Sequence, residues 1–243
     1  LSAPSTEAVV LVPARDEAAS VGAVVRGLRS LPVPLRVVVV DDGSTDDTAK
    51  VARRAGATVL THDAPLGNGA AIKTGLAATD EPWVVVVDGD GQHDPSMVPR
   101  LLAELRDGAD LVVGARTAFR GSGPWRSLGN RLLGAMASYM TGAGVPDLTS
   151  GLRAVRRVRL VPHVALLPDG FSTPTTTTLA LLHEGRDVRF VPVAARRRGE
   201  GRTHTRLLDD GARFLSIALR VSRLFRHWKA RAPVWGGVLA GGA

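Results

Sequence analysis

Five short apolar runs constrain the fold of this chain more than any other feature of its sequence. The runs are VVLV (9–12), VVVV (37–40), ATVL (57–60), VVVV (84–87) and DLVVG (110–114). Helical patterns lie between them, at about 17–28, from the polar residues 44–47 to about 55, at 68–78, and between the last two runs. Strands that are apolar on both faces and alternate with helices indicate a buried, mostly parallel sheet. We therefore predict an α/β fold in which helices cover both faces of a central sheet.

Length and composition narrow the possibilities further. A chain of 243 residues, 44% of them hydrophobic, can form one large domain or one domain with an appendage. Cysteine is absent, which excludes disulfides and thiolate metal sites. No run of about 18 apolar residues occurs, so we expect no complete membrane span.

The positive charge of the chain is concentrated near its C-terminus. Residues 196–231 contain eleven Arg or Lys and three Asp or Glu, so this stretch accounts for the whole net charge of +8. Such a segment indicates an anionic partner, which could be a membrane surface, a phosphorylated substrate or nucleic acid. A solvated helix face is the alternative interpretation.

Residues 207–231 within this stretch are predicted to form a basic amphipathic helix at a membrane interface. Much of one side carries arginines, at positions 213, 220, 223 and 226. The other side is apolar and consists of Phe214, Leu215, Ile217, Ala218, Val221, Leu224, Phe225 and Trp228. Residues 232–243 are mostly small and apolar, and are either the start of a membrane segment or a flexible end.

Acidic residues follow two of the apolar runs at the point where each predicted strand ends. Asp41 and Asp42 follow the second run, and Asp88 and Asp90 follow the fourth. Ligands of open α/β sheets bind beyond the carboxyl ends of the strands, where these acids would gather. We therefore expect the ligand site at this edge of the sheet.

The sequence Asp88-Gly89-Asp90 places two carboxylates two residues apart. Mg²⁺ and Mn²⁺ prefer oxygen ligands and often share them with substrate phosphates, so we expect a divalent cation here. Gln92 supplies another oxygen, and His93 either joins the ligands or packs beside the next helix. The alternative for the two acids is turn and helix-cap chemistry, because Asp-Gly is a common turn sequence.

Two other segments, one on each side of the fourth apolar run, are not predicted to bind a ligand. Asp94 and Pro95 fit the start of a helix, with Asp94 as its N-cap. The segment GNGAAIKT (67–74) is close to a phosphate-binding loop, but Ile72 occupies the place of the second glycine. The same segment fails the dinucleotide-binding pattern, which belongs after the first strand. Neither kind of nucleotide loop is predicted.

Seven segments in a fixed order resemble glycosyltransferase family 2, whose members have the nucleotide-sugar-binding fold called GT-A. They span roughly residues 8–206 and are VPARDE (12–17), VVVVDDGSTDDT (37–48), GNGAAIKTG (67–75), VVVDGDGQHDP (85–95), VVGAR (112–116), DLTSGLRAVRR (147–157) and FVPVAARRRGEGRTH (190–204). DGDGQHDP, DLTSGLRA and the late Arg-rich segment are most similar to those of the polyprenyl-phosphate hexose synthases, which include dolichyl-phosphate mannose synthase. The resemblance implies a GT-A domain over residues 1–206, followed by the amphipathic helix 207–231 and the terminal stub 232–243.

The resemblance also implies which residues bind the donor. Three residues would line the nucleoside pocket: Pro13, Arg15 and Glu17. Asp42 would contact the base or the ribose. The metal and the donor diphosphate would be held by Asp88, Asp90 and Gln92. The family usually has Tyr-Asn where this chain has Arg15-Asp16.

A second group of residues is implied to surround the acceptor and the transferred sugar. Arg116 and Arg131 would face the acceptor phosphate, and Arg202 would reach the phosphates from a loop. The sugar and acceptor site would be bordered by Asp147, Ser150 and Arg153. At Gly201-Arg202-Thr203 the family often has Gly-Lys-Ser or Gly-Glu-Ser. The solvated side of a strand is the alternative interpretation of three arginines: Arg153, Arg156 and Arg157. We expect catalysis to depend on Asp88, Asp90, Arg116, Arg131, Asp147 and Arg202.

The implied reaction is transfer of mannose or glucose from a nucleotide sugar to a polyprenyl or dolichyl phosphate, with inversion of the anomeric centre. An acceptor phosphate is already an anion at neutral pH, so it can attack without a general base. Donor diphosphate and acceptor phosphate repel each other unless cations lie between them, and a metal and arginines would supply these cations. A hydroxyl acceptor would need a base, for which Asp147 is the only candidate.

The expected partners are GDP-mannose or UDP-glucose, a polyprenyl phosphate and a membrane surface. The expected location is the cytoplasmic side of the cell membrane, with peripheral attachment or an anchor through the C-terminal segment. A soluble hydroxyl or phosphate acceptor is the alternative. Nucleic-acid binding through the basic tail is more distant and is not predicted, because aromatic residues form only 4% of the chain and stacking platforms are scarce.

Overall fold

A computed structural model describes residues 6–116, 124–170 and 173–194, with the side chains of 124–131 and 140 outside the description. The strands are β1 (Ala8–Ala14), β2 (Leu35–Asp41), β3 (Thr58–Thr61), β4 (Trp83–Val86), β5 (Leu111–Arg116), β6 (Arg153–Arg156) and β7 (Val188–Val193). The α-helices are α1 (Val21–Arg29), α2 (Thr48–Arg54), α3 (Asn68–Ala77), α4 (Val98–Arg106), α5 (Pro124–Thr141), α6 (Arg157–Leu160) and α7 (Thr173–His183). Two 3₁₀ helices are η1 (Pro95–Met97) and η2 (Val161–Leu166).

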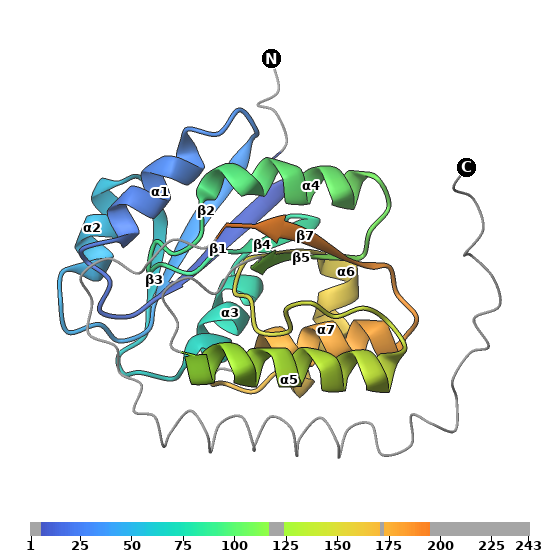
Figure 1. Cartoon of the computed structure of the whole chain (residues 1–243). Coiled ribbons are helices and arrows are strands. Elements are labelled where there is room, and N and C mark those ends of the chain that lie inside the picture. Colours follow the sequence, from blue (N-terminus) through green and yellow to red (C-terminus); the bar gives the residue numbers. More distant parts are fainter. Residues whose placement is uncertain (1–5, 117–123, 171–172, 195–243) are drawn as a thin grey trace.

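The strands of the described residues form one seven-stranded sheet in the order β3-β2-β1-β4-β6-β5-β7 (Figure 1). All neighbours are parallel except β6, which is antiparallel to both β4 and β5. The five apolar runs became β1 to β5, and the predicted mostly parallel sheet is confirmed. β1 lies between β2 and β4, so the acids that follow β2 and β4 flank the same strand end.

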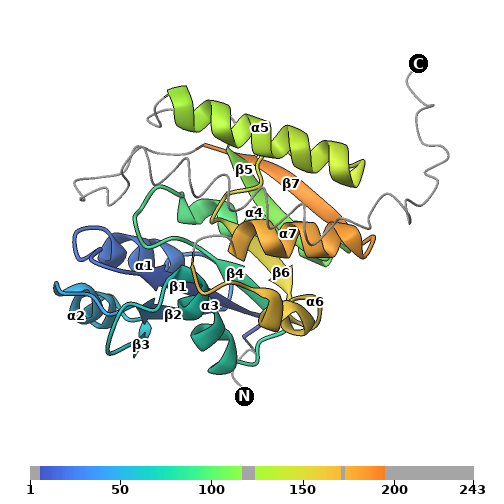
Figure 2. The ribbon, with the colours of Figure 1, turned by 90° about the horizontal axis from the view of Figure 1, so that it is seen from below.

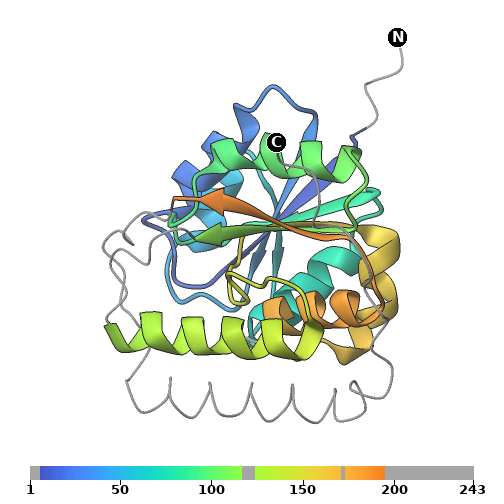
Figure 3. The ribbon, with the colours of Figure 1, turned by 45° about the vertical axis from the view of Figure 1, so that its right-hand side comes forward.

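Helices cover both faces of this sheet, as predicted. One face packs against α1, α2 and α4, and the other packs against α3, α6 and α7 (Figures 1 and 2). Alternate apolar residues of β1 point to opposite faces of the sheet and belong to two different cores. Val10 and Val12 pack in one core, and Val9 and Leu11 pack in the other. Helix α5 lies beside α7 on the same side of the sheet, where Leu133 and Ala137 pack on Leu179 (Figures 2 and 3).

Helix α1 begins at Val21, four residues after the predicted start at residue 17. The backbone N–H groups of residues 16, 17 and 18 find hydrogen-bond acceptors outside a helix, because side chains of the β2–α2 loop and the start of α2 accept from them. These acceptors are Ser44 Oγ at 2.9 Å, Thr48 Oγ1 at 2.8 Å and Asp46 Oδ2 at 3.1 Å. These three hydrogen bonds therefore connect the loop after β1 to the loop after β2.

The arginines of β6 and α6 are not on a solvated strand side, so that interpretation is wrong. Arg153 is only 3% exposed in the middle of the sheet. Arg156 donates to the carbonyl oxygens of Ala109 and Leu105, just beyond and at the end of α4. Arg157 directly follows the strand and donates to the carbonyl oxygen of Leu76 at the end of α3. A helix leaves its last carbonyl groups without partners, and these guanidinium groups satisfy them.

Replacing Arg157 with methionine is expected to lower the free energy of unfolding by about 2–3 kcal/mol, because three charge-assisted hydrogen bonds are lost. Arg157 donates to the carbonyl of Glu81 at 2.8 Å, the carbonyl of Leu76 at 3.0 Å and Thr79 Oγ1 at 2.7 Å. Urea denaturation should show a lower midpoint with an unchanged slope. The control is Arg100→Met at an exposed position, which should change stability by less than about 0.5 kcal/mol. Equal effects of the two substitutions would disprove the capping role.

Candidate active site

The loops that follow β1, β2 and β4 meet at the carboxyl edge of the sheet. The β1 and β2 loops are tied together as described above, and Ser20 Oγ donates to the carbonyl oxygen of Gly89 in the β4 loop at 2.8 Å. Asp16 has φ of 54°, a left-handed conformation that Asp and Asn tolerate better than most residues. Its carboxylate accepts from the backbone N–H of Thr45 at 2.8 Å. Asp16 can therefore occupy the position where Asn is usual.

Asp42 is buried at this edge of the sheet and connects His62 to the loop before α3. It is 5% exposed, and its carboxylate accepts from His62 Nδ1 and from the backbone N–H groups of Leu66 and Gly67, each at 2.8 Å. Burial alone would raise the pKa of Asp42, but the hydrogen bonds from His62, Leu66 and Gly67 outweigh it and hold the pKa below its ordinary value. The ring of His62 also contacts Thr74 Oγ1 at 2.9 Å. The expected contact between Asp42 and a base or ribose stays a prediction.

Asp88 and Asp90 lie beyond the end of β4, as predicted. The side chain of Asp88 is 34% exposed, and it packs directly on the backbone of Gly151. A Cβ atom at position 151 would lie 2.5 Å from Cγ and 2.7 Å from Oδ1 of Asp88, and closer still to Oδ2. Asp90 is partly buried, and its Oδ1 accepts from the backbone N–H of Gln92 at 3.0 Å. Turn chemistry therefore engages one oxygen of Asp90, while Asp88 lines the cavity beside Gly151.

This pair of acids fits a hard divalent cation that shares its ligands with a substrate. Among the described residues, no group of three or more His, Asp or Glu side chains is arranged to hold a metal by itself. Mg²⁺ is commonly bound by one or two carboxylates together with substrate phosphates and water, so two acids suffice for that kind of site. Asp88 and Asp90 would hold the ion, with Gln92 beside them.

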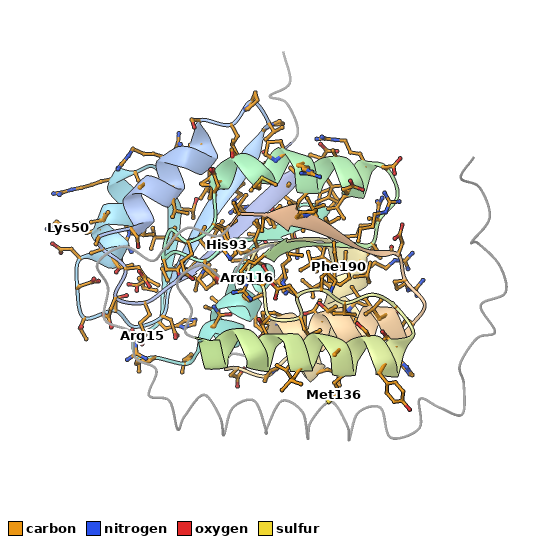
Figure 4. The ribbon with its side chains drawn as sticks, viewed as in Figure 1. Arg15, Lys50, His93, Arg116, Met136 and Phe190 are labelled. Atoms are coloured by element: carbon orange, nitrogen blue, oxygen red, sulfur yellow. The ribbon has the colours of Figure 1, made fainter. Side chains whose placement is uncertain are left out.

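His93 is buried next to Asp88, so its ring is not accessible from the solvent. It is 4% exposed, its Nε2 lies 3.8 Å from Asp88 Oδ2, and its Nδ1 has no hydrogen-bond partner within the described part of the chain. Burial lowers the pKa of His93, and the nearby charge of Asp88 opposes this effect. The charges of Arg116, Asp147 and Arg153 also act on His93, so we refer to these groups and Asp88 as the charged cluster. Figure 4 labels His93 and Arg116 close to each other. The next turn begins as predicted, because Asp94 accepts from the N–H of Ser96.

Arg116, the last residue of β5, forms a paired ion contact with Asp147. Its Nε lies 2.7 Å from Oδ2 and its Nη2 lies 3.0 Å from Oδ1. The same Nη2 donates to Thr149 Oγ1 at 2.7 Å, and the backbone N–H of Arg116 donates to Asp147 at 3.1 Å. Burial alone would raise the pKa of Asp147, but the hydrogen bonds and charge of Arg116 hold it below its ordinary value. Arg116 and Asp147, which were given separate roles around the acceptor, are therefore in direct contact.

Ser150 and Arg153 lie inside the protein beside Asp88. Ser150 is fully buried, and its Oγ has no hydrogen-bond partner within the described residues. Arg153 donates to the carbonyl oxygens of Ser150 and Pro174, and burial lowers its pKa to about 10, so it stays charged at neutral pH. A cavity of about 20 Å³ lies here, lined by Asp88, Gly151, Arg153 and residues of α3, α6 and α7. That volume is enough for one water molecule.

The N-terminus of α3 is closed to a phosphate, in agreement with the rejection of a phosphate-binding loop. The backbone N–H groups of Gly69 and Ala70 donate to the carbonyl oxygen of Asp169, at 2.7 and 3.1 Å. The ammonium group of Lys73 contacts the carboxylate of Asp169 at 2.8 Å. The groups that would bind a phosphate are therefore used to hold the loop before α7.

The remaining predicted site residues are placed in part. Pro13 is buried near the end of β1, and the side chain of Arg15 is 51% exposed. Figure 4 shows Arg15 at the rim of the molecule. Glu17 is 9% exposed and accepts from Ser20 Oγ at 2.9 Å. Arg131 belongs to α5, but its side chain lies outside the described residues. Arg202, the helix 207–231 and the stub 232–243 also lie outside them.

Three residues of the site were not identified from the sequence. Gly151 supports Asp88, Thr149 contacts Arg116, and His62 supports Asp42. Gly151 carried a signal, because it belongs to DLTSGLRAVRR (147–157), a segment already singled out. Thr149 belongs to the same segment, but its role depends on Arg116, which is far from it in the chain. His62 lies in no segment that was singled out, and its role depends on Asp42.

The sequence profile of glycosyl transferase family 2 matches residues 9–160. An uncharacterized glycosyltransferase of Mycobacterium tuberculosis is 44% identical over 117 residues, which are 48% of this chain and 52% of that relative, so about half of its length is matched. Glycosyltransferase AglJ of Haloferax volcanii is 30% identical over 96% of this chain and 76% of its own. Polyprenol monophosphomannose synthase of Mycolicibacterium smegmatis is 28% identical over 78% of this chain and 77% of its own.

A solved structure with a similar fold is glucosyl-3-phosphoglycerate synthase from Mycobacterium tuberculosis in complex with Mn²⁺, UDP-glucose and phosphoglyceric acid. Its TM-score is 0.71 at 26% identity, and the alignment covers 90% of this chain and 79% of that one. The similarity therefore extends over nearly the whole described chain.

Proposed function

Because the chain belongs to glycosyl transferase family 2 and has a GT-A-like α/β fold, we propose that it transfers a hexose from a nucleotide sugar to a polyprenyl monophosphate. The transfer inverts the anomeric carbon and uses a divalent cation. The observation that carries the proposal is that Asp88 lies in the same charged cluster as Arg116, whose guanidinium is held by a buried carboxylate. Relatives named polyprenol monophosphomannose synthase and dolichyl-phosphate hexose transferase support the class of acceptor.

The acidic part of the site suits a nucleoside diphosphate bound through a metal. A divalent cation held there supplies positive charge for the leaving diphosphate. Asp88 and Asp90 provide the carboxylates, and the absence of a side chain at Gly151 leaves the space that the Asp88 carboxylate occupies. The related structure that contains Mn²⁺ with UDP-glucose supports a divalent cation as the cofactor.

The basic part of the site suits an anionic acceptor. Arg116 presents a guanidinium, which pairs well with phosphate oxygens, and Arg153 adds a buried positive charge near Asp88. The acceptor phosphate is ionised already and needs no base. Alignment of the phosphate oxygen with the anomeric carbon, opposite the leaving group, is then the main task of the chain.

A soluble acceptor is the second candidate, and the similar structure with phosphoglyceric acid favours it. A hydroxyl acceptor would require a residue that takes its proton. Asp147, the candidate named from the sequence, has a side chain with 0% exposure, and its pKa is held below the ordinary value by Arg116. Such a carboxylate is a poor base, which favours an acceptor that is ionised already.

The donor and acceptor can be identified in two steps. Thermal-shift measurements with GDP-mannose, UDP-glucose and related sugars, each with Mn²⁺, should show stabilisation by one donor. That donor, labelled in its sugar, is then incubated with a short polyprenyl phosphate. Label extracted with the lipid supports the proposal, whereas donor binding without any lipid product argues against it.

Membrane association is part of the proposal, at the cytoplasmic side of the cell membrane. No helix within the described residues is long and apolar enough to span a bilayer. Two large apolar side chains of α5, Leu132 and Tyr139, are 62% and 77% exposed, and the basic segment 207–231 suits anionic lipids.

Removal of residues 207–243 is expected to reduce membrane association and activity on long-chain acceptors by about tenfold or more, since several basic residues each contribute roughly 1 kcal/mol near an anionic surface. Donor binding should change little. Vesicle co-sedimentation and transfer rates with short and long acceptors measure the two effects, and a chain truncated only at residue 231 is the control. Equal losses for donor and acceptor, with unchanged partitioning, would refute this role.

A further inference from the structure

Asp147 has no contact with solvent, and its carboxylate is directed at Arg116. Both of its oxygens accept from that guanidinium, at 2.7 and 3.0 Å, and its side chain is 0% exposed. The backbone N–H groups of Arg116 and Thr149 add two more hydrogen bonds, each at 3.1 Å. The oxygens of Asp147 are thus engaged by donors from two separate segments of the chain.

Arg116 is held on more than one edge. Nε and Nη2 meet Asp147, and Nη2 also meets Thr149 Oγ1 at 2.7 Å. A planar guanidinium held through two nitrogens cannot rotate about its long side chain without breaking both contacts. The side chain of Arg116 nevertheless keeps 19% exposure at the carboxyl end of β5. The charges of Arg116 and Asp88 both act on the buried His93, so the two side chains belong to the same charged cluster.

We propose that Asp147 is a positioning residue, which holds Arg116 in the orientation that receives the acceptor phosphate. Asp147 then neither takes a proton nor contacts the sugar. Thr149 assists it through the second contact with Arg116. The claim that the bound group is an acceptor phosphate rests on the proposed function. The claim that Asp147 orients Arg116 does not rest on it.

The two roles of Asp147, positioning residue and general base, predict different kinetics. Asp147→Asn is expected to lower kcat/KM for farnesyl phosphate by about 100-fold, as for other broken buried charge pairs. Most of this loss should appear in the KM of the acceptor, with the KM of the donor changed less than about twofold. A general base would instead lose kcat at constant acceptor KM, and the pH profile would lose its acidic limb.

A double-mutant cycle isolates the interaction. Arg116→Ala and Asp147→Asn should have effects that do not add, because each removes the same contact. Guanidinium ion at non-denaturing concentration should restore part of the activity of Arg116→Ala, with equal NaCl as the control. Rescue should disappear in the double variant Arg116→Ala, Asp147→Asn. Additive losses, or rescue that does not need Asp147, would overturn the inference.

Two further measurements keep the test decisive. If Asp147→Asn does not fold, Thr149→Val keeps the carboxylate and removes one contact, and should raise the acceptor KM by about three- to tenfold. An unchanged acceptor KM in that variant would count against the inference. If the unaltered enzyme transfers sugar to 3-phosphoglycerate and not to farnesyl phosphate, the proposed function fails, and the same cycle with 3-phosphoglycerate tests Asp147 separately.

Discussion

Replacing Asp88 or Asp90 with alanine is expected to abolish metal-dependent sugar transfer, with a fall in rate of about 1000-fold or more. The physical reason is electrostatic. The donor diphosphate and the acceptor phosphate are both anions, and their repulsion at close range is strong in a partly buried site. Without either carboxylate a divalent cation loses one of its two charged protein ligands at this edge, so the leaving diphosphate is poorly neutralised.

Initial rates with Mn²⁺, with Mg²⁺ and in chelator measure this effect for each variant. The matched control is Asp80→Ala, which changes an exposed acid that precedes β4. Both site variants should keep the melting temperature of the unaltered chain within a few degrees, because Asp88 is 34% exposed and its loss leaves no cavity in the core. Full activity in chelator, or in either variant, would contradict the metal assignment.

Gly151→Ala is expected to lower kcat/KM for both substrates by about 100-fold, the usual consequence of displacing a reacting group by about 1 Å. The added methyl group would overlap the carboxylate of Asp88, which must rotate away from its place. The backbone at Gly151 does not have positive φ, so alanine itself is tolerated there. The loss should therefore be one of activity and not of folding.

The control for this substitution is Gly144→Ala. Within the described part of the chain, and apart from its two chain neighbours, no atom lies within 4 Å of the Cβ that it would add, and the position does not have positive φ. Circular dichroism should show both variants folded, and steady-state kinetics should separate them. Unchanged kinetics for Gly151→Ala would mean that the observed position of Asp88 is not needed for transfer.

Most of the sheet could be predicted because its strands are uniformly apolar. β6 was not predicted, since Arg153 and Arg156 stand at its two ends and resemble a solvated surface. Their guanidinium groups find carbonyl acceptors inside the protein, which no local pattern reveals. β7 was not predicted either, as its partly buried residues and Pro192 give a weak signal, and Pro192 is tolerated at the sheet edge.

The site could be predicted only where local sequence determines it. Acids that follow a strand must lie at its carboxyl end, so Asp88 and Asp90 were placed correctly from their position alone. The pairing of Arg116 with Asp147 joins residues 31 positions apart, and its role depends on burial and geometry. The same holds for His62 under Asp42, which the fold brings within 2.8 Å.

A competition assay tests the central claim most directly. One reaction contains the labelled nucleotide sugar selected by thermal shift, Mn²⁺, a short polyprenyl phosphate and an equal concentration of 3-phosphoglycerate. We expect the label to enter the lipid product, to do so only with the metal present, and to leave phosphoglycerate largely unlabelled. Label found in phosphoglycerate instead, or lipid labelling that persists in chelator, would contradict the account.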